Sequence, residues 1–258
     1  MHFSEIDFQV EGPRGDITLN RPAKLNPLST TTLNELVSAA HYLDTCTDVK
    51  VVVVAGRGRA FSAGADLASF TAGDASAVSA RDAADAGRRM AEAIEAMRAV
   101  TVASIHGHCV GGGVVLASAC DLRIAADDTR FSIPEVDLGI PLAWGGIPRL
   151  VREIGPARTK ELVMTCRPFG AGEALAAGFV NRVVAAADLG AAVDDLVESL
   201  AGKSALTLTS TKRHTNAVTE QMVGAMRAWN DADSLVTALG DPESRAAGAA
   251  YLKGLGRG

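Results

Sequence analysis

The sequence predicts an α/β fold, with a mainly parallel sheet in the first part of the chain and a helical region at its C-terminal end. Short apolar, β-branched runs alternate with helix-like segments up to about residue 145. Wholly apolar strands of this kind are typical of parallel sheets that are covered on both faces. Beyond that point the pattern is mostly helical. With 258 residues, 48% of them hydrophobic, the chain can bury a full core without disulfides or metal ions.

Four short apolar segments are the predicted strands of this sheet. They are residues 17–19, 51–55, 100–105 and 122–125. Two of the strands are followed by segments rich in small residues, which we expect to be irregular. Residues 56–73 are predicted to form a loop, and residues 107–113 a glycine-rich turn.

Helices are predicted between these strands. Ser29 is suited to cap the first one, because its hydroxyl can accept a hydrogen bond from a free amide of the first turn. The apolar residues that follow it recur at helical spacing. Residues 75–99 are predicted to form a long, Ala-rich helix, and another helix begins at residue 114. The predicted buried stripes are Leu33, Leu36, Val37, Ala40 and Leu43 in the first helix and Met90, Ile94 and Met97 in the second.

The second half of the chain is predicted to be helical. Pro156 stands where a helix would start and Gly178 where one would end. Residues 189–254 have the pattern of three or four helices and no strand. We therefore expect an α/β core, residues 1–200, and a C-terminal helical region, residues 201–258, without a sharp boundary between them.

Composition excludes several classes of partner. The formal charge is −5, from 25 basic and 30 acidic side chains, and no basic run stands out, which disfavours nucleic-acid binding. No apolar run reaches the length of a membrane span, and the N-terminal residues lack the pattern of a signal peptide. The four cysteines form no CxxC pair. We expect a cytoplasmic protein with reduced, buried thiols.

Common catalytic motifs are also missing. The chain has no GxSxG nucleophile elbow and no HExxH, and its Gly202-Lys203-Ser204 lacks the first glycine of a P-loop. Gly56-Arg57-Gly58 is followed by Phe61 where a dinucleotide fingerprint needs a third glycine. No acidic and histidine residues cluster at metal-ligand spacing. The sequence therefore implies no metal and no redox cofactor.

Two glycine-rich loops follow predicted strands, at residues 60–67 and 107–113. The carboxyl ends of parallel strands are where α/β sheets place their ligands. The backbone N–H groups near Gly112, at the start of a helix, would be free donors for an anion. Side by side, the loops could bind an oxyanion. On local chemistry alone they could equally be tight turns that need glycine.

Several motifs in order along nearly the whole chain resemble the crotonase superfamily, the enoyl-CoA hydratase/isomerase family. Residues 17–28 are similar to the family's opening strand and CoA-contacting turn, and residues 171–184 to the segment before its C-terminal helices. The central motifs are AFSAGADL at 60–67, GHCVGGG at 107–113 followed by residues 120–125, and FSIPE at 131–135 with Leu138-Gly139.

The resemblance implies a core of repeated ββα units with a C-terminal helical region, assembled as a homotrimer or a dimer of trimers. It implies an enzyme of fatty acid metabolism that acts on an acyl-CoA thioester and uses no other cofactor. The family stabilises a thioester enolate with two backbone N–H groups. By position, the donors in this chain are Ala65 and Gly112.

The proton chemistry departs from that of the family's hydratases, which carry two glutamates. Glu135 matches one of them, but Val115 stands at the position of the other. Valine neither accepts nor donates a proton, so the activation of water should suffer. Moving a double bond from C3 to C2 needs only one base. The sequence therefore favours an enoyl-CoA isomerase with Glu135 as the catalytic residue.

Several alternatives stay open. The chain could be a hydratase that positions its water by another group, or a non-catalytic acyl-CoA-binding protein. Dienoyl-CoA isomerases resemble the Glu-Val-Asp-x-Gly run here, but they place an acidic residue eight positions after the glutamate, where this chain has Ala143. Thioester hydrolysis and decarboxylation also occur in the family.

The resemblance also implies a set of residues that bind the substrate. Lys24 is expected to meet a CoA phosphate, and its neighbours to contact CoA through the backbone. Asp66 is expected to orient the first loop, and Val115 and Leu142 to make the acyl pocket apolar. Trp144 either lines that pocket or is a plain core aromatic residue. The full expected set is Ala23, Lys24, Leu25, Ala63, Asp66, Leu67, Gly111, Val115, Leu142, Trp144, Tyr251 and Lys253.

Overall fold

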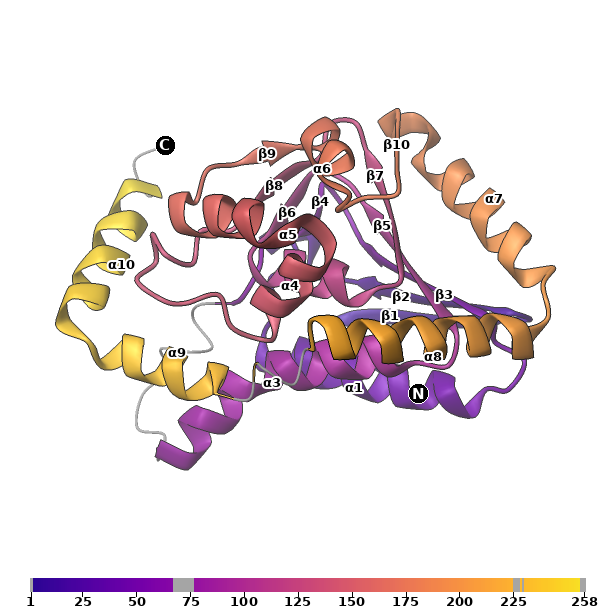
Figure 1. Cartoon of the computed structure of the whole chain (residues 1–258), viewed down its shortest axis with the longest axis horizontal. Coiled ribbons are helices and arrows are strands. Elements are labelled where there is room, and N and C mark those ends of the chain that lie inside the picture. Colours follow the sequence, from indigo (N-terminus) through magenta and orange to yellow (C-terminus); the bar gives the residue numbers. More distant parts are fainter. Residues whose placement is uncertain (1, 67–76, 225–227, 229, 256–258) are drawn as a thin grey trace.

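The structure, a computed structural model, describes residues 2–66, 77–224, 228 and 230–255 (Figure 1). Its larger sheet has six strands in the order β1-β2-β3-β5-β7-β10. β1 pairs antiparallel with β2, and all the other pairs are parallel. The strands are β1 (Ile6–Glu11), β2 (Arg14–Leu19), β3 (Val51–Gly56), β5 (Val100–Ile105), β7 (Leu122–Ala126) and β10 (Arg182–Val184).

A second, four-stranded sheet carries the two glycine-rich loops. Its order is β4 (Ala60–Ser62), β6 (His108–Val110), β8 (Arg130–Ser132) and β9 (Phe169–Gly170). The first three strands are parallel and β9 is antiparallel to β8. Each of β4, β6 and β8 follows directly after a strand of the larger sheet and precedes a helix. The predicted α/β fold of repeated ββα units is therefore confirmed.

Helices cover both faces of the larger sheet (Figure 1). The alternate side chains of β3 show why its sequence is wholly apolar. Val52 and Val54 face the main core, whereas Val51 and Val53 pack against one face of α7. The helices of the described residues are α1 (Thr30–Thr45), α3 (Ala77–Ala96), α4 (Gly112–Ala119), α5 (Gly146–Thr165), α6 (Ala171–Ala177), α7 (Leu189–Ala201), α8 (Ala205–Met222), α9 (Asp231–Gly240) and α10 (Pro242–Leu255), with 3-10 turns at Pro22–Lys24 and Ala186–Asp188.

The predicted helix boundaries are confirmed where capping chemistry defined them. The Ser29 hydroxyl accepts a hydrogen bond from the Thr32 amide, 3.1 Å away, at the start of α1. Gly178 ends α6 with a φ of +85°. Gly155, with a φ of +76°, breaks α5 so that Pro156 begins its second half. The described residues between 189 and 254 form four helices and no strand, in agreement with the three or four helices predicted there.

The shortest strands were not predicted. The loop expected over 56–73 contains β4, and its residues 67–73 lie outside the described part of the chain. The turn expected over 107–113 contains β6. Each of these strands has three residues, too few to show an alternating pattern. Their pairing is decided by tertiary contacts rather than by local propensity.

Candidate active site

The first glycine-rich loop is held as an extension of the sheet beside Leu28. The Leu28 amide donates to the Gly64 carbonyl at 2.8 Å, and the Asp66 amide donates to the Leu28 carbonyl at 3.0 Å. Consecutive amides of an extended chain point to opposite sides. The Ala65 N–H therefore points away from Leu28, and Ala65 lines the cavity described below.

The second loop meets the first at Gly64. A Cβ on Gly64, whose φ is +89°, would lie 2.7 Å from the Val110 carbonyl oxygen and 3.5 Å from the Gly112 nitrogen. Gly112 is the first residue of α4, where a helix leaves its amides without internal partners. Ala65 and Gly112 line the same cavity. The arrangement is compatible with two amides that bind one oxygen.

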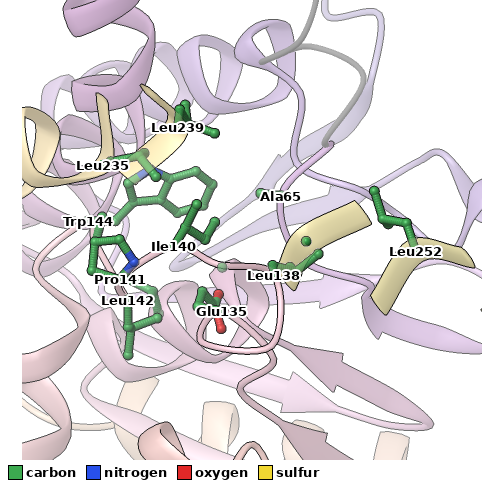
Figure 2. A pocket seen from close by; sticks show the side chains of 14 residues that line it. Ala65, Glu135, Leu138, Ile140, Pro141, Leu142, Trp144, Leu235, Leu239 and Leu252 are labelled. Atoms are coloured by element: carbon green, nitrogen blue, oxygen red, sulfur yellow. The ribbon is translucent and has the colours of Figure 1, made fainter. Parts of the chain in front are cut away.

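Ala65 and Gly112 line an apolar cavity of about 140 Å³. Figure 2 shows Glu135 in the middle of the lining, with Trp144 and Leu252 toward opposite sides of it. Among the described lining residues, Glu135 is the only one with a titratable side chain. The lining consists of Ala65, Gly112, Val115, Glu135, Leu138, Ile140, Pro141, Leu142, Ala143, Trp144, Leu235, Leu239, Gly248 and Leu252.

A compact run of turns presents Glu135 to the cavity. The Leu138 amide donates to the Pro134 carbonyl at 3.0 Å, and the Ile140 amide to the Glu135 carbonyl at 2.9 Å. On the other side, Gly111 makes room for the carboxylate, since a Cβ there would lie 2.3 Å from Glu135 Oε1. Gly111 has a φ of +47°, and its amide N–H donates to the Ser132 carbonyl at 2.9 Å.

The Glu135 side chain is buried and poorly solvated. Its Oε2 has no hydrogen-bond partner among the described residues. Burial raises the pKa of Glu135 from 4.5 to about 7, because the charged form loses its hydration. A carboxyl group with such a pKa can both accept and release a proton near neutral pH.

Val115 makes part of the wall that surrounds this carboxyl group. It lies on α4, one turn after Gly111, and is 1% exposed. A Cβ on Gly146 would lie 2.9 Å from both Val115 Cγ2 and Leu142 Cγ, so the two side chains pack there together. The expectation that Val115 and Leu142 make the pocket apolar fits this arrangement.

The turn expected to contact CoA adjoins the first loop but does not line the cavity. The Ala63 amide donates to the Leu25 carbonyl at 2.8 Å, which joins the turn to the loop. Leu25 has a φ of +64°, and Ala23 and Lys24 are exposed beside it. Leu67 lies outside the described residues.

An ion pair fixes the outer side of the first loop. Arg21 Nη1 donates to Asp66 Oδ2 at 2.9 Å and to the Pro27 carbonyl at 3.2 Å. Both charged side chains are less than one fifth exposed. Glu5 approaches the same guanidinium at 3.4 Å.

The C-terminal helix contributes to the cavity through residues other than those expected. On α10, Tyr251 is half-buried and Lys253 is exposed, and neither residue lines the cavity. Leu252, which lies between them in the sequence, does line it. A Cβ on Gly139 would lie 1.9 Å from the Ser244 carbonyl oxygen, and one on Gly248 would lie 2.5 Å from that of Leu138. α10 is thus packed directly onto the turns that present Glu135.

Sequence reasoning missed part of the lining. Leu235 and Leu239 of α9 lie one turn apart and face the indole of Trp144 (Figure 2). Their spacing predicts an apolar helix face, but it gives no indication of which cavity that face covers. The other lining residues that were not foreseen are Leu138, Ile140, Pro141, Ala143, Gly248 and Leu252.

Other features bear on cofactors and location. Within the described part of the chain, no three side chains are arranged to hold a metal ion. No helix in that part is long and apolar enough to cross a membrane. All four cysteines are free thiols, and Cys109, Cys120 and Cys166 are buried, whereas Cys46 is half-buried.

Comparison with known proteins identifies similar chains. The model of the family described as enoyl-CoA hydratase/isomerase matches residues 15–251. "Probable enoyl-CoA hydratase echA8" of Mycobacterium bovis is 42% identical over 68% of this chain and 66% of that protein. The peroxisomal "Delta(3,5)-Delta(2,4)-dienoyl-CoA isomerase" of Arabidopsis thaliana is 35% identical over 84% of this chain and 83% of that protein.

The fold comparison agrees. The crystal structure of an enoyl-CoA hydratase from Mycobacterium avium subsp. paratuberculosis K-10 superposes with a TM-score of 0.87. It is 26% identical, and the match covers 97% of this chain and 99% of that one.

The buried carboxyl group generates a prediction about stability. Because the pKa of Glu135 is about 7 when folded and 4.5 when unfolded, the two states differ in bound protons only between these two values. Between these values the unfolded chain releases its proton first, so stability falls as the pH rises, and the penalty is complete above 7. Glu135→Gln removes this titration. Its stability relative to the wild type should rise by up to about 3 kcal/mol between pH 5 and pH 8.

Urea unfolding of both proteins at the two pH values measures this difference. Comparing the change with pH, rather than the absolute stabilities, cancels any fixed effect of burying an amide. An equal gap between variant and wild type at both pH values would contradict the raised pKa.

Proposed function

Because the chain belongs to the enoyl-CoA hydratase/isomerase family, we propose that this acyl-CoA enzyme converts 3-enoyl-CoA thioesters into 2-enoyl-CoA thioesters. One observation carries the proposal. Among the described residues, the cavity lining has a single group able to move a proton, Glu135, and its other side chains are apolar. One carboxylate suffices for a reaction that removes a proton from one carbon and returns it to another.

In the proposed reaction, Glu135 accepts a proton from C2 of the thioester. The electron pair of the broken C–H bond moves toward the carbonyl oxygen and gives a dienolate. The Ala65 and Gly112 amides donate to that oxygen, where negative charge develops. Glu135 then returns its proton to C4, and the double bond is left between C2 and C3. With a pKa of about 7, the carboxyl group serves both steps near neutral pH.

Hydration of a 2-enoyl thioester is the second candidate, favoured by the names of the mycobacterial relatives. It requires a group that positions and activates water while C2 is protonated. Val115 stands where the resembling hydratases carry their second glutamate, and valine offers no hydrogen bond. Dienoyl-CoA isomerisation is disfavoured in the same way, because Ala143 stands where the resembling dienoyl-CoA isomerases carry an acidic residue.

The two reactions can be compared directly on one purified sample. We expect isomerisation of a 3-enoyl-CoA to exceed hydration of the matching 2-enoyl-CoA. Glu135→Gln should lower the isomerisation kcat by about 10²–10⁴-fold, the usual contribution of one positioned acid–base group. Asp137→Asn is the matched control, because Asp137 is an exposed carboxylate two residues away that does not line the cavity.

Faster hydration than isomerisation in the wild type would contradict the single-base proposal. If neither reaction proceeds but acyl-CoA esters bind, the protein is a binding protein or acts on another thioester.

The CoA moiety is proposed to lie outside the cavity, over the turn at residues 22–25 and the end of α10. Lys24 would pair with a phosphate, with Ala23, Leu25, Ala63 and Leu67 contacting CoA through the backbone. Tyr251 and Lys253 would meet it from α10. Support comes from the exposed positions of Lys24 and Lys253, because phosphates need accessible cations.

Asp66 is proposed to be a positioning residue. It adjoins Ala65, and its ion pair with Arg21 holds the loop in the register that points the Ala65 amide into the cavity. Loss of the ion pair should displace the Ala65 amide from its position without removing the residues that bind the substrate. A displaced donor should affect the transition state more than the bound substrate.

Arg21→Met should therefore lower the isomerisation kcat by roughly tenfold, less than the loss of a whole oxyanion donor, and leave KM almost unchanged. Arg21→Lys should recover part of the loss. Arg57→Met is the control, since Arg57 is a more exposed arginine that pairs with Asp7 instead. A change confined to KM would contradict the positioning role.

We further propose that the chain assembles as a homotrimer or a dimer of trimers, with residues 201–258 as a C-terminal helical region that covers the cavity and contributes to assembly. Large apolar side chains on α8 support an interface there, since Leu206 is 80% exposed and Met222 71%. Sedimentation equilibrium should give three or six times the chain mass of 26.6 kDa. A monomer would contradict the assembly.

A further inference from the structure

Trp144 has a backbone conformation that a tryptophan rarely adopts. Its φ is +62°, and the next residue, Gly145, also has a positive φ of +71°. A bulky residue in this region is an outlier, and such strain persists only when the surroundings hold it. The Trp144 side chain is nevertheless 5% exposed and lines the cavity. The strained backbone thus delivers an indole ring into a binding site.

Two glycines make room for this ring. A Cβ on Gly87 of α3 would lie 1.9 Å from Trp144 Cδ2, and a Cβ on Gly112 would lie 2.3 Å from Cζ3. The indole therefore fills the space between α3 and the start of α4. The amide of Gly112 is one of the two proposed oxyanion donors, so the ring lies directly beside the reacting end of a bound thioester.

The strained segment is fixed from outside. The Gly145 amide donates to Asp231 Oδ2 at 2.8 Å, and Arg149 Nη1 donates to the Gly145 carbonyl at 3.2 Å. Arg149 is itself buried and forms an ion pair with Glu95. With its backbone fixed by these contacts and its ring packed against Gly87 and Gly112, Trp144 forms a wall of the cavity.

Trp144 is a buried part of the cavity wall, at 5% exposed, whereas α9 and α10 contribute partly exposed lining residues, Leu239 at 42% and Leu252 at 48%. Figure 2 places Trp144 and Leu252 toward opposite sides of the cavity. The cavity of about 140 Å³ is similar in volume to an engineered apolar cavity of about 150 Å³ that binds benzene, a ligand of six carbons. Long chains would need the space that the indole occupies.

We propose that Trp144 sets the acyl-chain length of the substrate, and that the enzyme prefers acyl groups of about four to six carbons. The proposal rests on the acyl-CoA site of the proposed function, but it does not depend on which reaction is catalysed. Removal of the indole would extend the cavity between Gly87 and Gly112 and admit longer chains.

Calorimetric binding of saturated acyl-CoA esters tests the proposal without chemistry. The probes are the butanoyl, hexanoyl, octanoyl and decanoyl esters. Wild-type affinity should stop rising after hexanoyl. In Trp144→Ala it should continue to rise through octanoyl or decanoyl, by about fourfold for each further methylene buried. Trp144→Phe, which keeps a ring at this position, should shift the optimum less.

Three further variants sharpen the test. Gly87→Ala places a Cβ where the indole lies, so it should weaken binding of hexanoyl-CoA, and Gly87→Ala/Trp144→Ala should restore it. Leu252→Ala is the matched control, because this apolar side chain lines the opposite part of the cavity. It should lower the affinity for all four esters alike and leave the length profile unchanged.

Each outcome has one meaning. The same length profile in wild type, Trp144→Ala and Trp144→Phe would overturn the proposal, as would a wild type that binds decanoyl-CoA best. Failure of the wild type to bind any of the four esters would instead contradict the acyl-CoA site itself. Thermal unfolding of each variant identifies any that fails to fold, and Trp144→Phe then decides the question.

Discussion

The close approach of two backbone loops is the constraint on which the rest of this site depends. Gly64 touches Val110 and Gly112, Gly111 touches the Glu135 carboxylate, and Gly112 touches the indole of Trp144. A Cβ at any of these glycines would collide with a neighbour. Two amides can face one cavity only because these positions carry no side chain. The second sheet, whose strands end at these loops, fixes the approach.

The same compactness explains the chemistry of Glu135. Dense apolar packing leaves one carboxylate oxygen without a partner among the described residues and raises the pKa of the group. Burying such a group destabilises the folded protein above its pKa. The large core can offset that loss, since both faces of the main sheet are covered by apolar clusters. A carboxyl group with a pKa near neutral pH therefore comes at the expense of stability, as is common at functional sites.

The sequence predicted what local patterns determine. Long apolar strands, the Ser29 cap and the end of α6 at Gly178 each follow from a few neighbouring residues. Strands of three residues, such as β4 and β6, could not be predicted because their pairing is tertiary. Glu135 and Val115, both singled out through motif positions, line the cavity, whereas their catalytic roles stay predictions. Leu235, Leu239 and Leu252 were missed, since a helix face gives no sign of its partner. The left-handed backbone of Trp144 has no sequence signal, because tryptophan disfavours it.

Family membership leaves the reaction open for a physical reason. The relatives include proteins named as hydratases and as a dienoyl-CoA isomerase, and the fold is common to the family. The proposed backbone donors would stabilise an enolate whatever its source. What differs between the reactions is the number and placement of proton-transferring groups around the enolate, and we propose that Val115 takes the place of one such group here. Trp144 packs against Gly112, the first residue of α4, and Val115 belongs to the first turn of the same helix. In the proposed enzyme, substitutions on one short helix and its facing loop would therefore change both the reaction and the chain length while the fold stays constant.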